Sequence, residues 1–217
     1  MSAPNLFQQF AEELTQRLLR PLPGALAHDR MAPPMRRSFP MDPDTIAKSS
    51  EAAVLALFFP AESTSDTAEL LLTVRPEGMS NHGGQVAFPG GRRESNESLQ
   101  ETALRETEEE VFIQASIIRI AGALTPLYIP PSNFYVHPFV GFLDHRPDLS
   151  VTSEEIARCF GVPVSRLIDP DVSRITPQKW NGEFHDLPYF ALGGEFVWGA
   201  TAMILAELTD SLPVRST

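Results

Sequence analysis

The sequence lacks three features that would point away from a soluble cytoplasmic protein. Its 217 residues include one cysteine, Cys159, so no disulfide can form within the chain and a reducing compartment is expected. No apolar run is long enough to cross a bilayer, because glycine and proline interrupt each one. The first residues show no basic region followed by an apolar stretch, so we expect no secretory signal. These absences predict a soluble cytoplasmic protein without membrane contacts.

Positive charge is also scarce. The chain has 17 Lys and Arg residues against 28 Asp and Glu residues, a net charge of -11. A protein that binds nucleic acid through the phosphates needs a basic surface, so we expect no nucleic-acid partner. A phosphorylated small molecule stays compatible with this charge, since a bound divalent metal is the largest local charge in its site.

The composition divides the chain into two parts. Residues 1–48 hold an amphipathic helix pattern, which predicts a helix that docks on the body or joins two copies in a homodimer. The six prolines from Pro21 to Pro43 predict an extended connector without a regular helix. Residues 49–217 form the body, where strand-like runs and helical patterns alternate irregularly. This mixture predicts an α/β fold with a mixed sheet and helices on its faces.

The expected elements of the body follow from apolar spacing and turn residues. We expect strands over 52–59, 70–74, 85–88, 116–124, 134–143, 172–176 and 187–192. We expect helices over 99–111, 154–160 and 201–208. Ser98 and Glu101 form the capping-box pattern that begins the first of these helices.

Three glutamates of that helix carry the chemical signal. At about 100° per residue, Glu106, Glu109 and Glu110 fall within an arc of about 100°. Like charges at this spacing destabilise a helix, whereas Mg2+ and Mn2+ prefer carboxylate oxygens. The alternative is a solvated acidic face. The Gly90-Gly91 pair before the helix favours a metal and phosphate site, because the backbone can approach a ligand closely at glycine.

The segment from Gly91 to Ile113 resembles the Nudix box, G-x5-E-x7-R-E-U-x-E-E-x-G-U, in which U is a bulky apolar residue. The matching positions are Gly91, Glu97, Arg105, Glu106, Glu109, Glu110 and Ile113. Thr107 stands at a position that is usually apolar, and Phe112 replaces the final glycine, which normally supplies an unusual backbone angle. The resemblance implies a Nudix-type α/β/α sandwich with a mixed β-sheet.

The resemblance also implies roles for these residues in the metal-dependent hydrolysis of a diphosphate. Glu106, Glu109 and Glu110 would bind Mg2+ or Mn2+, with the carbonyl of Gly90 or Gly91 as a further ligand, and Glu106 and Glu109 would be catalytic. Gly91, Glu97 and Arg105 would hold the loop and helix in place. A late carboxylate acts as base in many such enzymes. Glu155 is our candidate ahead of Glu154, although acidic residues of a first helical turn commonly serve the helix dipole.

Upstream residues narrow the resemblance to one branch. The sequences LLTVR, ending at Arg75, and HGGQVAFPGG, from His82 to Gly91, are similar to the signature of coenzyme A diphosphatases. This implies cleavage of coenzyme A or acyl-coenzyme A into 3′,5′-ADP and (acyl-)4′-phosphopantetheine. Arg75, His82, Gln85 and Arg92 are the candidate substrate-binding residues. An ion pair for Arg75 and a loop cap at His82 are the structural alternatives. Two other functions stay open: a Nudix hydrolase of ADP-ribose or NADH, and a binding module without turnover.

Overall fold

The computed structural model describes residues 5–38, 42–63, 66–78, 83–150, 152–180 and 182–213. Its helices are α1 (Leu6–Leu18), α2 (Ala25–Met31), α3 (Pro43–Ala47), α4 (Leu99–Val111), α5 (Val164–Leu167) and α6 (Gly199–Ser211). Its strands are β1 (Ser50–Pro60), β2 (Ala68–Val74), β3 (Val86–Ala87), β4 (Gly90–Arg92), β5 (Arg119–Ala123), β6 (Leu127–Ile129), β7 (Phe134–Phe142), β8 (Arg158–Pro163), β9 (Ser173–Trp180), β10 (Glu183–Leu192) and β11 (Glu195–Val197). Short 3-10 turns occupy Pro34–Ser38, Ala115–Ile117, Pro130–Ser132 and Pro170–Val172. Within these residues, no helix combines the length and apolar character that a membrane crossing needs.

The larger sheet is mixed, as the sequence predicts. Its strands run in the order β3-β2-β1-β7-β5, with β4 paired to β1, β6 to β7 and β8 to β2. β1 and β7 are parallel, from Ser50 opposite Phe134 to Phe58 opposite Phe142, while β1 is antiparallel to β2 and β4. β1 is therefore bonded on both edges, which explains why its sequence is an almost unbroken apolar run.

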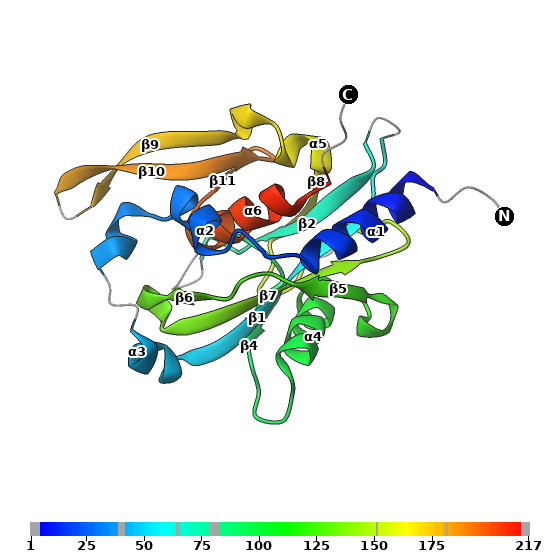
Figure 1. The fold of residues 1–217 in the computed structure, drawn as a ribbon, viewed down its shortest axis with the longest axis horizontal. Coiled ribbons are helices and arrows are strands. Elements are labelled where there is room, and N and C mark those ends of the chain that lie inside the picture. The colour runs from blue at the N-terminus through cyan, green and yellow to red at the C-terminus, as the bar shows by residue number, and fades with distance from the viewer. Residues whose placement is uncertain are drawn as a thin grey trace.

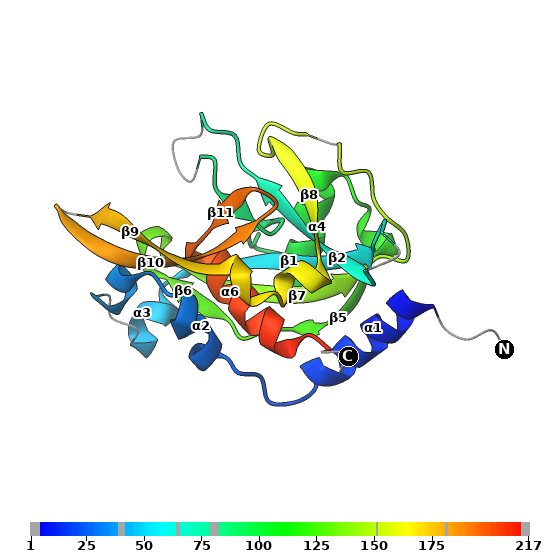
Figure 2. The same cartoon turned by 90° about the horizontal axis from the view of Figure 1, so that it is seen from above.

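Helices cover both faces of this sheet (Figures 1 and 2). Successive side chains of a strand point to opposite faces. On β1, Leu55 and Leu57 consequently join the core that includes Ala103 of α4. Phe58 joins the core on the other face, together with residues of α1 and α6. The architecture is the α/β/α sandwich that the sequence predicts.

A smaller sheet of order β11-β10-β9 stands beside the sandwich. β9 and β10 form a long hairpin, paired from Ser173 opposite Phe190 to Trp180 opposite Glu183, which projects at the upper left of Figure 1. Both strands continue past the expected ranges, because cross-strand pairing extends through polar residues that form no apolar run.

The N-terminal helix packs on the sandwich. α1 buries Phe7, Phe10 and Leu14, and the ring of Phe10 lies 5.3 Å from the ring of Phe58 in β1. The amphipathic pattern is therefore explained by docking on the chain's own core. The expected division of the chain at residue 48 stays a prediction.

The prediction of an extended connector between Pro21 and Pro43 is wrong over α2. Residues 24–32, between Pro23 and Pro33, contain no proline. A short helix can therefore form its amide hydrogen bonds there. This segment is anchored by Glu207 of α6, a fully buried residue. Its carboxylate accepts hydrogen bonds from the Gly24 amide (3.1 Å) and from the amide (3.0 Å) and hydroxyl (2.6 Å) of Thr125, and it lies 3.0 Å from Nε2 of His28.

Burial opposes the ionisation of Glu207. The hydrogen bonds from His28 and Thr125 outweigh this effect and hold the pKa of the carboxyl below its usual value. The side chain therefore acts as a buried anion that joins α6, α2 and the segment after β5.

The prediction of a helix over 154–160 is also wrong. Residues from Arg158 onward form β8, in which Cys159 lies opposite Thr73 of β2. Glu154 and Glu155 lie in a bend before this strand. Pairing with a buried strand gives β8 backbone hydrogen bonds and an apolar environment, which override a weak local preference for helix.

Candidate active site

Glu97 braces the loop between β4 and α4. Its carboxylate accepts hydrogen bonds from Nε (3.0 Å) and Nη2 (2.9 Å) of Arg105, from the Thr102 hydroxyl (2.9 Å) and from the Glu94 amide (2.8 Å). The bonds from Arg105 are the main reason that the pKa of Glu97 falls to about 2. Arg105 also donates to the carbonyl of Arg92 (3.1 Å). These contacts connect both ends of the loop, as the bracing role expected of Glu97 and Arg105 requires.

α4 begins and ends at the predicted residues. The Ser98 hydroxyl accepts a hydrogen bond from the Glu101 amide (3.3 Å), and the Glu101 carboxylate accepts one from the Ser98 amide (2.7 Å). After Val111, the backbone of Phe112 takes the left-handed conformation, with φ 57° and ψ 28°. This conformation costs a residue with a side chain about 1–2 kcal/mol. Phe112 therefore makes the turn for which the Nudix box normally uses glycine.

Gly90 and Gly91 bring the backbone of β4 against two of the glutamates. The Gly90 amide donates a hydrogen bond to the Glu110 carboxylate (3.0 Å). A Cβ atom on Gly90 would lie 2.3 Å from the carbonyl oxygen of Ala53, and one on Gly91 would lie 2.4 Å from Cδ of Glu106. A side chain at Gly90 would overlap the backbone of β1, and one at Gly91 would have to displace the Glu106 carboxylate, so the two glycines set how closely β4 approaches β1 and α4.

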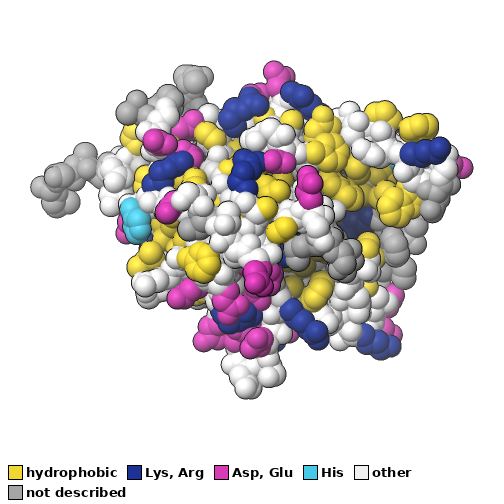
Figure 3. Space-filling model, turned by 180° about the vertical axis from the view of Figure 1, so that it is seen from behind, with side chains coloured by type: hydrophobic (Ala, Val, Ile, Leu, Met, Phe, Trp, Pro, Cys, Tyr) yellow, Lys and Arg dark blue, Asp and Glu magenta, His cyan; other side chains and the backbone are white. Residues whose placement is uncertain are grey.

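Glu106, Glu109 and Glu110 line one cavity. Its volume is about 200 Å3, and the opposite wall consists of Ser153, Glu154 and Glu155. In Figure 3, acidic side chains gather over the region of α4, with Lys or Arg side chains among them. Burial raises the pKa of Glu106 and raises that of Glu110 to about 7. The structure thus brings the three predicted metal ligands together with Glu155, the predicted base.

Two arginines contact this group of carboxylates. Nη1 of Arg105 lies 3.0 Å from Glu106 and 3.1 Å from Glu109. Arg75, at the end of β2, places Nη2 3.6 Å from Glu110 and Nη1 4.0 Å from Glu155. Arg75 therefore forms the ion pairs that were the structural alternative to substrate binding, at the edge of the acidic cavity.

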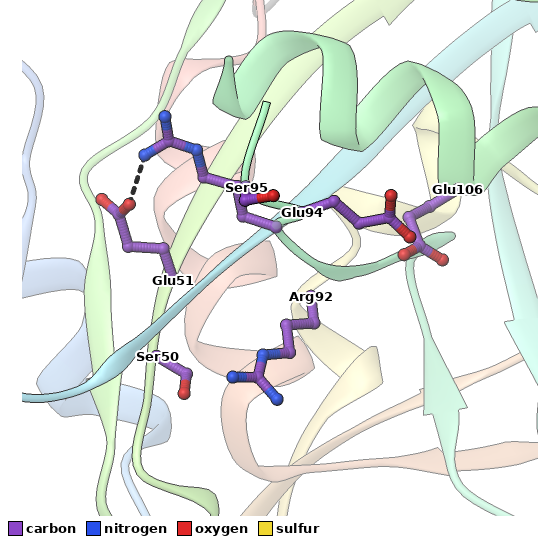
Figure 4. Close-up of a pocket in the computed structure, with 7 residues that line it drawn as sticks. Ser50, Glu51, Arg92, Glu94, Ser95 and Glu106 are labelled. Atoms are coloured by element: carbon purple, nitrogen blue, oxygen red, sulfur yellow. Dashed lines mark hydrogen bonds and ion pairs between the residues drawn. The ribbon is translucent and has the colours of Figure 1, made fainter. Parts of the chain in front are cut away.

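A second cavity of about 640 Å3 also borders Glu106 (Figure 4). It is lined by Ser50, Glu51, Arg92, Arg93, Glu94, Ser95 and Glu106. Glu106 lines both cavities, so the predicted metal site borders a larger space. The predicted substrate residue Arg92 lies in the wall of this larger cavity.

The other predicted substrate residues lie upstream of β4. Gln85 accepts a hydrogen bond at its carbonyl from the Arg75 amide (3.0 Å), which holds the end of β2 beside the start of β3. His82 lies outside the described residues. The two parts of the upstream signature, LLTVR and QVAFPGG, are thus adjacent in space at Arg75 and Gln85.

The sequence did not identify Glu51, Ser153 or the second cavity. Glu51 enters the site because β1 pairs with β4, with Ala52 opposite Arg92. It forms an ion pair with Arg93 (2.5 Å). No spacing rule connects residues so far apart in the chain. Ser153 and Glu154 line the smaller cavity because the chain bends there instead of forming the expected helix.

The residues of the smaller cavity fit a hard divalent cation. Its lining offers five carboxylates, and such oxygen ligands suit Mg2+ or Mn2+. A cation there would also stabilise the charged form of buried Glu110, which burial disfavours. Among the residues that the structure describes, no three acidic, His or Cys side chains are already gathered as a metal site. Arg105 forms ion pairs with Glu106 and Glu109, and a bound cation would compete with it for these carboxylates.

Comparison with known proteins shows the family of the chain. The family model described as the NUDIX domain matches residues 50–180. The uncharacterized Nudix hydrolase NudL of Yersinia enterocolitica is 36% identical over 151 residues, which cover 67% of this chain and 74% of the relative. NudL of Yersinia pestis is 36% identical over 146 residues, covering 67% and 73%. Among solved structures, a MutT/nudix family protein from Enterococcus faecalis aligns with a TM-score of 0.49 at 17% identity, covering 84% of this chain and 71% of that one.

Proposed function

The chain belongs to the Nudix family and is a hydrolase of pyrophosphate bonds, and on this premise we propose that its substrate is coenzyme A or acyl-coenzyme A. The products are 3′,5′-ADP and (acyl-)4′-phosphopantetheine. One observation carries the proposal: Arg75, at the end of LLTVR, contacts both Glu110 and Glu155 and is bonded through its amide to Gln85. Gly90, in the second half of the signature, donates its amide to Glu110, so both halves of the coenzyme A diphosphatase-like signature contact carboxylates that line the acidic cavity.

The proposed metal ligands are the carboxylates of Glu106, Glu109 and Glu110 and the carbonyl of Gly90. Members of the family generally use divalent metal ions, and here we propose Mg2+ or Mn2+. A bound cation of this kind neutralises charge on the diphosphate oxygens and makes its bound water more acidic. Gly90 and Glu110 are already joined by the amide hydrogen bond of 3.0 Å, so the backbone of β4 and the helix carboxylates meet at one point.

Glu155 is the proposed base. Its side chain is exposed over 62% of its surface and lines the cavity opposite Glu109 and Glu110. From there it can accept the proton of a water molecule that attacks a phosphorus of the diphosphate, while the bond between that phosphorus and the bridging oxygen breaks. Arg75 orients the Glu155 carboxylate, with its Nη1 4.0 Å from Oε2 of Glu155. Arg105 and Glu97 hold α4 and the loop before it in a fixed relative position, which fixes the carboxylates of α4 relative to the substrate.

The alternative substrates ADP-ribose and NADH share the diphosphate and differ in what flanks it. The test is therefore a parallel incubation of the purified protein with coenzyme A, ADP-ribose and NADH in Mg2+ or Mn2+, with product analysis by chromatography. Metal-dependent release of 3′,5′-ADP, with little product from the other two substrates, is the expected result. Cleavage of another diphosphate without cleavage of coenzyme A would overturn the substrate and leave the Nudix reaction in place.

A further inference from the structure

The larger cavity differs in chemistry from the acidic one beside it. Each of its lining residues has a polar or charged side chain: Ser50, Glu51, Arg92, Arg93, Glu94, Ser95 and Glu106. Its volume of about 640 Å3 lies within the range of about 300–1,000 Å3 that is typical of small-ligand sites. An acyl or pantetheine chain would gain little from such walls, since its burial is favourable against apolar surface. The cavity therefore suits a polar, charged part of a substrate.

The arginines near this cavity differ in whether their guanidinium groups already form ion pairs or hydrogen bonds. Arg93 is paired with Glu51 and donates to the carbonyl of Glu97. Arg105 is fully engaged with Glu97, Glu106 and Glu109. The Arg92 guanidinium, by contrast, has no hydrogen bond or ion pair with any residue in the described part of the chain. Arg92 therefore offers a planar set of donors that can bind an anion without breaking an existing contact.

Arg92 also lies at a definite side of the reacting centre. Figure 4 shows its guanidinium extending toward Ser50, away from the carboxylates of Glu94 and Glu106. Its backbone is fixed by β4, with Ala52 opposite, and by the hydrogen bond from Arg105 to its carbonyl (3.1 Å). An anion held there would lie in the larger cavity, which shares only Glu106 with the acidic cavity.

We propose that this cavity binds the phosphorylated ribose of the substrate and that Arg92 recognises the phosphate outside the cleaved diphosphate. This inference rests on the proposed function, because coenzyme A carries such a phosphate at the ribose 3′ position. Ser50 and Ser95 supply hydroxyl groups to the same ligand. Arg92 thereby sets the preference for 3′-phosphorylated diphosphates over those that lack this group.

The first test is binding of the product half of the substrate by calorimetry, which needs no turnover. The probes are 3′,5′-ADP and 5′-AMP, which differ by the 3′-phosphate. We expect the wild-type protein to bind 3′,5′-ADP more tightly, and Arg92→Gln to weaken that binding by about tenfold to a hundredfold, the range for a charged hydrogen-bonded contact. Equal losses for both nucleotides, or equal binding of both by the wild-type protein, would overturn the proposal.

The second test is the ratio of kcat/KM for coenzyme A to that for 3′-dephospho-coenzyme A. Arg92→Gln should lower this ratio by about the same factor, while Lys179→Gln, which removes one positive charge from β9 outside both cavities, should keep the wild-type ratio. An unchanged ratio in Arg92→Gln contradicts the proposal while coenzyme A turnover persists. Absence of coenzyme A turnover in the wild-type protein contradicts the proposed function instead, and the two failures are thereby distinguished.

Discussion

The Glu106 carboxylate occupies the space where a side chain on Gly91 would begin, since a Cβ atom there would lie 2.4 Å from Cδ of Glu106. This contact joins β4 to α4 at the predicted metal site. It gives a reason for glycine at position 91, because a strand without a side chain there can pass the Glu106 carboxylate without displacing it.

Gly91→Ala should displace Glu106 and lower the rate of diphosphate hydrolysis. A misplacement of about 1 Å in an active site costs about a hundredfold in rate, and we expect a loss of that order with the fold retained. Steady-state kinetics and circular dichroism measure the two effects. The matched control is Gly78→Ala, because a Cβ atom at Gly78 meets nothing within 4 Å. Equal activity of Gly91→Ala and Gly78→Ala would contradict the role given to this contact.

Glu97→Gln should make stability depend less on pH in the acidic range. The pKa of Glu97 is lowered from 4.5 to about 2, mainly by the hydrogen bonds from Arg105. A depressed carboxyl pKa stabilises the folded state above the unfolded pKa, and that contribution disappears as the pH falls through the folded pKa. Urea unfolding of wild type and Glu97→Gln should therefore differ at pH 7 and converge between pH 4.5 and about 2. A constant difference across this window would refute the linkage.

Phe112→Gly should stabilise the protein. Phe112 holds φ 57°, its ring is 60% exposed, and glycine adopts this conformation without the steric cost. We expect a gain of about 1 kcal/mol, or a rise of about 2–4 °C in Tm. Phe112→Ala is the control, because it removes the ring and keeps the strain. The Tm values of wild type, Phe112→Gly and Phe112→Ala are compared by thermal unfolding. An equal rise in Tm for both variants would assign the stabilisation to loss of the exposed ring.

Glu207→Gln should loosen the N-terminal segment. The substitution keeps the shape of the side chain and removes the charge and one of its two acceptor oxygens. Oε1 accepts from the Gly24 amide and the Thr125 hydroxyl, while Oε2 accepts from the Thr125 amide and lies beside His28. Leaving a buried donor without its partner costs about 1–3 kcal/mol, and limited proteolysis should cut near α2 sooner. Glu13→Gln, on the exposed side of α1, is the matched control. Unchanged urea unfolding in Glu207→Gln would show that the carboxylate does not anchor this segment.

Local signals predicted the helix of the candidate site correctly. The capping box of Ser98 and Glu101 and the spacing of the glutamates placed α4 between its observed ends, because both depend on residues within a few positions of one another. The central strands were found for a similar reason: a strand buried on both faces is an apolar run whatever its partners.

Contacts between residues far apart in the chain could not be predicted from the sequence. Glu51 enters the larger cavity through the pairing of β1 with β4, and the bend at Glu154 exists because β8 pairs with β2 rather than forming a helix. Phe112 is a different case. The sequence showed that glycine was missing, and the structure shows that the backbone angle is kept without it.

The most direct measurement of the central claim is coenzyme A hydrolysis by wild type and Glu109→Gln over a titration of Mn2+, with Mn2+ binding followed by electron paramagnetic resonance. Glu109 is a surface side chain, 59% exposed, so its substitution should leave the fold intact. Wild type should bind Mn2+ and release 3′,5′-ADP in proportion to bound metal, and Glu109→Gln should bind Mn2+ more weakly and lose about a hundredfold or more of the rate. Equal metal binding and turnover in the two proteins would contradict the metal role of the glutamates, and ligand binding without turnover in either would identify a binding module.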